Sequence, residues 1–207
     1  MRSLENFESK ARPLLESYMD PKSDHSFTTY DVCPHNTSDL LRPEDILVAN
    51  LLSLRLAAKH VVPLFAATES SEGTGLGALR RALDEALVAL RPAAAFESFS
   101  SAEAMQDALE PLARANRATR SVRGWTPVTV SKVLHRQAPQ VVPIVDSRVR
   151  DFYSVAKGQE YELRARMWTD IRANIGWPSS VAAEHRTPDG RPVSVLRAAD
   201  ILIWSAG

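Results

Sequence analysis

The sequence predicts an all-α protein, and three features of its pattern indicate this class. Apolar residues recur at spacings of three and four along most of the chain, which is the period of an amphipathic helix. Only residues 141–145 and 192–195 have the composition of strands, and their prolines argue against central strands. No repeat or long linker divides the 207 residues, so we expect one compact helical domain over residues 1–207, in one or two lobes.

The individual helices are predicted from their caps and apolar stripes. Residues 43–58 begin with a proline and two acids, which suit the first turn of a helix. Residues 78–90 carry leucines on one stripe until Pro92 ends it, and residues 101–119 begin at a capping serine, with Pro111 expected to kink or divide the helix. Further helices are expected at residues 128–135, 147–155, 161–174 and 194–204.

Cysteine content and hydropathy exclude several classes of protein. A single cysteine, Cys33, excludes an intrachain disulfide, a cysteine-ligated iron–sulfur cluster and a multi-cysteine zinc site. No apolar run approaches the roughly 20 residues that cross a bilayer, and the first residues carry acids where a signal peptide is apolar. We therefore expect a cytoplasmic protein without a membrane role, cofactor or metal.

Two local clusters have simpler explanations than a ligand site. Gly73, Gly75 and Gly77 precede a helix but follow no predicted strand, so residues 70–77 are predicted as a loop and not as a phosphate-binding turn. A second cluster combines metal-capable side chains without the spacing of a known zinc finger, and we expect a polar loop with a buried thiol. Its members are Asp24, His25, Asp31, Cys33 and His35.

The charge is unevenly distributed, although 25 basic and 25 acidic residues give a net charge of zero. Between residues 114 and 150 the only acid is Asp146. Four arginines there recur every third residue, so on a helix they lie along one side, either as a stripe that tracks phosphates or as an ordinary solvated face. They are Arg114, Arg117, Arg120 and Arg123.

The basic segment, residues 114–153, has the pattern of a helix, a hairpin and a second helix. Gly124 supplies the turn, Thr126 is a good N-cap, and Pro127 suits the first position of the next helix. The free N–H groups at such a helix start, together with the hairpin backbone, form an anion site of the kind that holds a nucleic-acid phosphate.

Asp146 follows an extended apolar stretch and stands at the entrance of the next predicted helix. Ser147, Arg148 and Arg150 come directly after it. From position alone, Asp146 is either an N-cap or part of an Asp–Arg pair that holds the turn.

Residues 124–149 resemble the helix–hairpin–helix segment of the DNA glycosylase superfamily that includes endonuclease III. The run IVDSRV matches the family's V-D-T-H-V segment, and Asp146 falls on its catalytic aspartate. The resemblance implies a glycosylase-like, all-α fold with two lobes. The chain also looks like an uncharacterised actinobacterial domain family, in the segments PEDILVANLLS, SKVLHRQAPQVVPIVDSRV and LRAADILIW; that family brings no established activity.

The chain departs from the glycosylase pattern at two places. The hairpin reads V-R-G-W-T-P where the family has L-P-G-V-G, so Thr126 replaces a glycine and Pro127 removes a backbone donor. The position of the lyase lysine falls on Val128, and Lys132, one turn later, is expected to point elsewhere. These departures predict reshaped phosphate binding and no lyase activity.

The resulting hypothesis is a monofunctional DNA N-glycosylase-like enzyme in which Asp146 stabilises positive charge at the sugar and activates water. The expected partner is duplex DNA with a flipped base. Trp125, at the hairpin tip, is interpreted either as a probe of DNA or as ordinary packing. Two alternatives remain: a small-molecule enzyme on the same fold, and a non-catalytic module that binds nucleic acid or protein. The expected DNA contacts are Arg117, Arg120, Arg123, Gly124, Trp125, Thr126, Lys132, Arg136, Arg148 and Arg150.

Overall fold

The computed structural model describes residues 2–33, 36–66, 75–187 and 189–205. Within these ranges the protein is all-helical, with eleven α-helices and several short 3-10 helices. The described residues form no β-strand, and a single isolated antiparallel bridge joins Arg186 and Pro192. The all-α prediction is therefore confirmed.

The N-terminal part of the chain consists of short helices. They are η1 (Leu4–Phe7), α1 (Ala11–Met19), η2 (Ser26–Thr28), α2 (Pro43–Leu47), η3 (Val48–Leu52) and α3 (Ala58–Ala66).

The remaining helices are mostly longer. They are α4 (Gly75–Leu90), η5 (Phe96–Ser98), α5 (Ala102–Ala108), α6 (Glu110–Ala118), η6 (Thr119–Ser121), α7 (Pro127–Gln137), α8 (Ser147–Tyr153), α9 (Glu160–Ala173), α10 (Gly176–Glu184) and α11 (Val195–Ser205).

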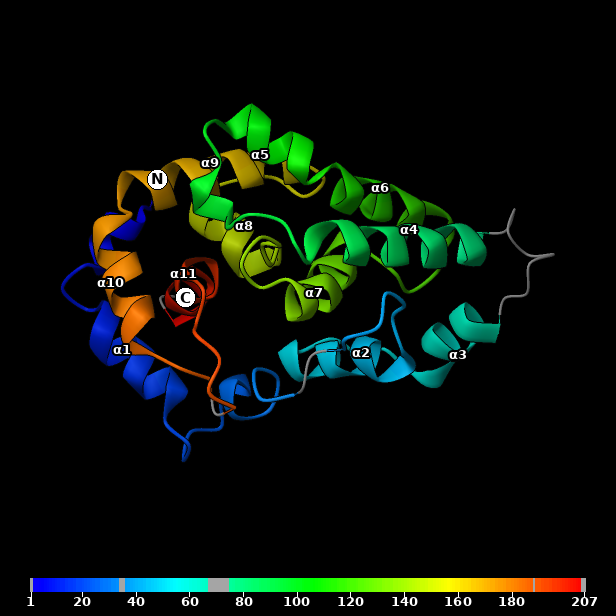
Figure 1. The fold of residues 1–207 in the computed structure, drawn as a ribbon, viewed down its shortest axis with the longest axis horizontal. Coiled ribbons are helices and arrows are strands. Elements are labelled where there is room, and N and C mark those ends of the chain that lie inside the picture. The colour runs from blue at the N-terminus through cyan, green and yellow to red at the C-terminus, as the bar shows by residue number, and fades with distance from the viewer. Residues whose placement is uncertain (1, 34–35, 67–74, 188, 206–207) are drawn as a thin grey trace.

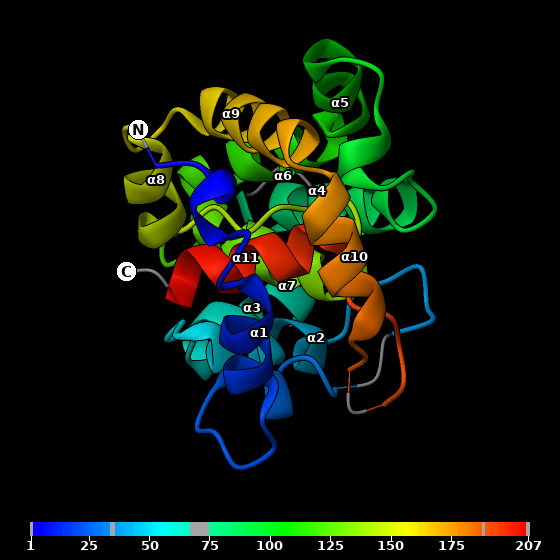
Figure 2. The same ribbon diagram turned by 90° about the vertical axis from the view of Figure 1, so that its left-hand side faces the viewer.

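Two helices form the centre of the molecule. Helix α11 is buried from Leu196 to Ile203 and packs against α1, α8 and α10, which surround it in Figure 1. Figure 2 shows α11 crossing the middle of the molecule between α9 and α1. Helix α7 is buried from Thr129 to Gln137 and contacts α2, η3, α4 and α6. Because both helices are enclosed, their polar residues must find partners inside the protein.

Most of the predicted helices agree with observed ones to within one or two residues at their ends or are divided by a proline, and the division at Pro111 is confirmed. Ser101 caps α5 by accepting a hydrogen bond from the Ala104 N–H, and α6 begins at Glu110 with Pro111 in its first turn. Helices α1, α3 and α10 had not been predicted; Pro63 lies inside α3, and α10 begins with a glycine.

The single helix predicted over residues 43–58 is wrong. The segment instead forms the short helices α2 and η3, which end at Leu52. Ser53 then adopts the left-handed conformation with φ of 63°. The Asn50 side chain accepts a hydrogen bond from the Leu56 N–H and donates one to the Leu56 carbonyl. These bonds fold the chain back before α3, which a pattern of apolar residues does not reveal.

The loop predicted at residues 70–77 is also partly wrong, because α4 already begins at Gly75. A Cβ at Gly75 would lie 2.8 Å from the Ser121 Oγ, so this glycine permits close packing of α4 against η6. Gly73 lies outside the described residues. No helix among the described residues has the length and apolar character needed to cross a bilayer.

Candidate functional site

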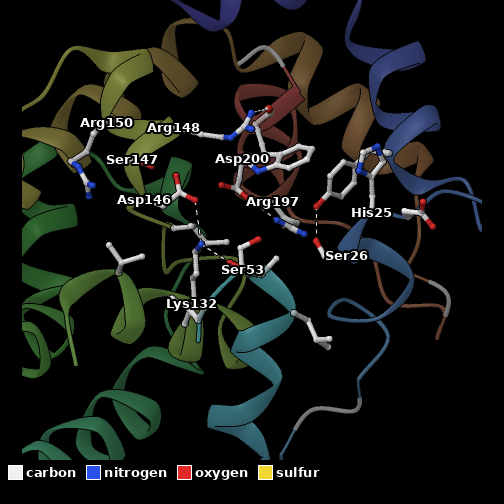
Figure 3. Close-up of a pocket in the computed structure, with 18 residues that line it drawn as sticks. His25, Ser26, Ser53, Lys132, Asp146, Ser147, Arg148, Arg150, Arg197 and Asp200 are labelled. Carbon is white, nitrogen blue, oxygen red and sulfur yellow. Dashed lines mark hydrogen bonds and ion pairs between the residues drawn. The ribbon is translucent and has the colours of Figure 1, made fainter. Parts of the chain in front are cut away.

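A cavity of about 490 Å³ lies where the α1–η2 segment, η3, α7, α8 and α11 meet. Figure 3 shows its lining, in which charged side chains face aromatic ones. The charged residues that line it come from α7, from α8 and its N-cap, from α11 and from the N-terminal loop, which are separate segments of the sequence. They are Lys132, Asp146, Arg148, Arg150, Arg197, Asp200 and, from the N-terminal loop, Asp24.

Asp146 is both an N-cap and a member of the cavity wall. One carboxylate oxygen accepts a hydrogen bond from the Val149 N–H at 3.2 Å, in the first turn of α8. The other oxygen lies 3.3 Å from the Lys132 ammonium. The side chain keeps 18 % of its surface exposed, so the carboxylate is fixed from two directions and still open to the cavity.

Lys132 lies in the cavity and not on the outer surface. Its side chain is only 8 % exposed, and its ammonium donates a hydrogen bond of 2.8 Å to the Leu52 carbonyl. The expectation that Lys132 points away from the position of Val128 is wrong, because residues four apart share one face of a helix and both line the cavity. Its predicted contact with DNA stays a prediction, and its ionic partner in the structure is Asp146.

Three buried ionisable side chains, those of Asp31, Arg197 and Asp200, form an array at one wall of the cavity. The Arg197 guanidinium donates to both carboxylate oxygens of Asp31, at 3.1 and 2.7 Å, and also to Asp200 one turn along α11. Burial opposes the charge of Arg197, but the carboxylates of Asp31 and Asp200 raise its pKa well above the ordinary value. Burial raises the pKa of Asp200 to about 6, and the nearby charge of Asp146 contributes in the same direction.

Aromatic side chains form another wall of the cavity. The rings of Tyr18 and His25 are stacked with centroids 4.7 Å apart, and Trp204 meets His25 edge-on at 5.5 Å. The Arg148 guanidinium lies 4.7 Å from the centre of the Trp204 ring and donates a hydrogen bond to the Trp204 carbonyl. This wall offers flat faces on which a planar ring can stack.

The hairpin before α7 forms as predicted, but its tryptophan is buried. Gly124 has φ of 87°, and a Cβ there would lie 2.6 Å from the His60 ring. Trp125 is 4 % exposed and donates a hydrogen bond to the His60 carbonyl at 3.0 Å. Of the two interpretations of Trp125, these contacts support packing against α3. Thr126 is confirmed as the N-cap, since its hydroxyl accepts the Thr129 N–H.

The arginines predicted to contact DNA differ in their exposure, in their ionic partners and in whether they line the cavity. Arg120 and Arg123 are exposed, and Arg117 is exposed but paired with Glu110 at 2.5 Å. None of these three lines the cavity. Arg150 does line it and donates to the Val145 carbonyl at 2.9 Å.

Arg136 requires a further correction. This residue is only 3 % exposed, because α7 is enclosed on all sides, so it cannot contact DNA. Burial lowers the pKa of its guanidinium, and the charge of Arg191 adds to this effect.

The acidic and histidine-containing loop near the N-terminus contributes to the cavity and does not form a metal centre within the part of the chain that is described. His25 joins the aromatic wall, and Asp31 pairs with Arg197. Cys33 is half-buried, not fully buried as expected, and its thiol donates to the Thr29 carbonyl at 3.2 Å. His35 lies outside the described residues.

Sequence analysis assigned no functional role to Arg197 and Asp200 and did not link Asp31 to them. A signal was present: these are the only charges in the otherwise apolar stretch VLRAADILIW. Two charges on a helix that is apolar all round must be buried, and buried charges require partners.

The chain, including the residues that line the cavity, matches a known family. A model of the family of unknown function DUF6308 matches residues 11–207. The chain belongs to DUF6308. In this DUF6308 member the match spans every element that builds the cavity, from α1 to α11. Searches of the curated proteins and of the solved structures found no match.

Proposed function

We propose that this protein hydrolyses the N-glycosidic bond of a nucleoside unit in DNA, without lyase activity. The observation that carries the proposal is the placement of Asp146. Its carboxylate opens to a polar cavity directly after a helix–hairpin–helix segment, and Lys132 and the Val149 N–H fix its orientation. The resemblance of residues 124–149 to the DNA glycosylase superfamily supports the same assignment.

The chemistry requires negative charge beside the sugar and a base for water. As the bond between the sugar and the base breaks, positive charge develops on the sugar ring, and a fixed carboxylate stabilises it. The same carboxylate can accept a proton from the attacking water. Lys132 is held by Asp146 and by the Leu52 carbonyl, and the position of the superfamily's lyase lysine falls on Val128, which supports hydrolysis without a Schiff base.

The remaining walls suit the other parts of a nucleotide. Tyr18, His25 and Trp204 provide flat faces for a flipped base. Arg148 lies against Trp204, and Arg150 lies on the same helix on the far side of Asp146 in Figure 3; both guanidinium groups line the cavity and can contact phosphates.

The hairpin provides a route for longer DNA. Val128, in the first turn of α7, lines the cavity, so the exposed residues Arg123 and Thr126 lie close to the cavity along the chain. Arg123 and the N-terminus of α7 would then hold the backbone of the duplex while the target base enters the cavity.

The test is a fluorescence-anisotropy titration of a labelled duplex, with and without an abasic-site analogue, at low and moderate salt. We expect tighter binding to the analogue, and affinity that falls steeply as salt rises because phosphate contacts release counterions. Arg123→Ala should weaken binding and reduce the salt dependence, whereas Arg186→Ala, which removes an exposed arginine outside the cavity, should not. Absence of binding at low salt would contradict the DNA assignment.

A small-molecule substrate is the second candidate, and specific observations favour it. Two of the predicted DNA contacts, Trp125 and Arg136, are buried, and a third, Arg117, is paired with Glu110. A free nucleoside or nucleotide would use the same cavity without the hairpin. This candidate predicts that a nucleotide raises the melting temperature of the protein while duplex DNA does not bind.

A further inference from the structure

We propose that Asp200 is the acid that protonates the departing base, so that the site works with two carboxylates of opposite roles. This inference rests on the proposed hydrolysis of an N-glycosidic bond. It assigns a catalytic role to a residue of α11 that also forms an ion pair with Arg197 one turn away.

The Asp200 carboxyl group lies at the wall of the cavity. The residue is 6 % exposed, and its side chain lines the same cavity as Asp146. One oxygen, Oδ2, accepts from Arg197, while Oδ1 makes no hydrogen bond with any described residue. Figure 3 shows Asp146 and Asp200 next to each other, with Lys132 on the side of α7. A proton on Oδ1 would therefore face the cavity.

Arg197 does not need Asp200 for charge balance. Asp31 already binds the guanidinium through two oxygens, at 3.1 and 2.7 Å. A second ionised carboxylate at the same buried arginine would add uncompensated negative charge in a place from which water is excluded, which costs free energy. A protonated Asp200 avoids this cost and keeps a hydrogen available.

Some of the groups around Asp200 raise its pKa and others lower it. Burial is the main cause that raises its pKa, to about 6, and the charge of Asp146 adds to it, while Arg197 and Lys132 oppose it. The other titratable or charged groups that line the cavity from α1, the following loop and α8 are Tyr18, Asp24, His25, Arg148 and Arg150. Near neutral pH the two neighbouring carboxylates thus have different environments, one paired with an ammonium and one desolvated.

The proposed step conserves atoms and charge. The bond between the sugar carbon and the base nitrogen breaks, and its electron pair stays on the base. The Asp200 Oδ1–H proton moves to the base, while a water oxygen bonds to the sugar carbon and gives its proton to Asp146. Exchange with solvent afterwards returns the proton from Asp146 and restores the one on Asp200.

The kinetic test compares bases that differ in their need for a proton. Uracil and hypoxanthine leave a neutral nucleoside as anions unless they are protonated, whereas 7-methylguanine leaves a cationic nucleoside as a neutral base. We expect Asp200→Asn to lower kcat at least about 100-fold for the first two and less than about threefold for 7-methylguanine, with KM little changed. Asp146→Asn should be slow on all three. Equal losses on all three bases with Asp200→Asn, or no loss on any, would overturn the proposal.

A second measurement is independent of turnover. In protein labelled with 13C at aspartate carboxyl groups, the resonance that disappears in Asp200→Asn should titrate near pH 6. Titration near the ordinary carboxyl value of 3.8 would overturn the acid role whatever the activity. If Asp200 titrates near 6 but none of the three bases is released, the proposed hydrolysis fails and the catalytic role of Asp200 fails with it.

Discussion

Replacement of Asp200 by asparagine should change how stability depends on pH, and this can be measured before any substrate is known. Asparagine keeps the size of the side chain and a carbonyl oxygen that can accept from Arg197, but it does not ionise. The folded chain holds Asp200 with a pKa of about 6, whereas an ordinary aspartate has 3.8. A carboxyl group whose pKa is raised on folding stabilises the folded chain while protonated and loses this contribution as pH rises.

The magnitude follows from the two pKa values. A difference of roughly two corresponds to about 3 kcal/mol between the fully protonated and the fully ionised limits. Between about pH 4.5 and about pH 7.5 the wild type should lose about 2 kcal/mol of unfolding free energy relative to Asp200→Asn, since part of the change lies below this window.

The assay is urea denaturation of both proteins at several pH values, followed by tryptophan fluorescence. The difference in unfolding free energy isolates Asp200 because the other groups titrate in both proteins. Asp107→Asn, the same chemical change at an exposed aspartate, is the control and should give a difference that stays flat. A difference between wild type and Asp200→Asn that does not change with pH would refute the assignment of a raised pKa. So would a wild type that becomes more stable relative to Asp200→Asn as pH rises.

Three further changes test the packing of the site. Arg197→Met should cost about 3–5 kcal/mol in urea denaturation, because it leaves two buried carboxylates without their shared partner; a loss below about 1 kcal/mol would contradict the buried array. Lys132→Met should lower the melting temperature less in an Asp146→Asn background than alone, since asparagine leaves no uncompensated charge; equal losses would contradict the pair. Gly124→Ala should destabilise the chain by about 1 kcal/mol or more beyond Gly158→Ala, because both have positive φ but only Gly124 abuts a side chain; equal unfolding free energies would exclude the contact.

Local rules predicted the parts of the fold that depend on neighbouring residues. The caps Thr126 and Asp146 and the division at Pro111 are short-range features, and the structure bears them out. Asp146 was found because its cap position and its match to a known motif coincide at one residue.

The remainder depends on contacts that sequence spacing does not encode. Asp31 and Arg197 are 166 residues apart along the chain, so nothing local links them. Arg136 was expected to contact DNA as part of the basic segment, but α7 is enclosed by its neighbours and Arg136 is buried. The helix predicted over residues 43–58 failed for a similar reason, since the Asn50 side chain competes with the helix for backbone partners.

The central claim is that the Asp146 carboxylate drives hydrolysis of an N-glycosidic bond, and base release tests it most directly. Free base released from duplexes carrying single damaged bases is measured by mass spectrometry for the wild type and Asp146→Asn. Asparagine is also a good N-cap, so this change removes the charge and keeps the start of α8. The account predicts release by the wild type, at least about 100-fold slower release by Asp146→Asn, and similar DNA affinity for both. Equal release by the two proteins, or none from any duplex by the wild type, would contradict it.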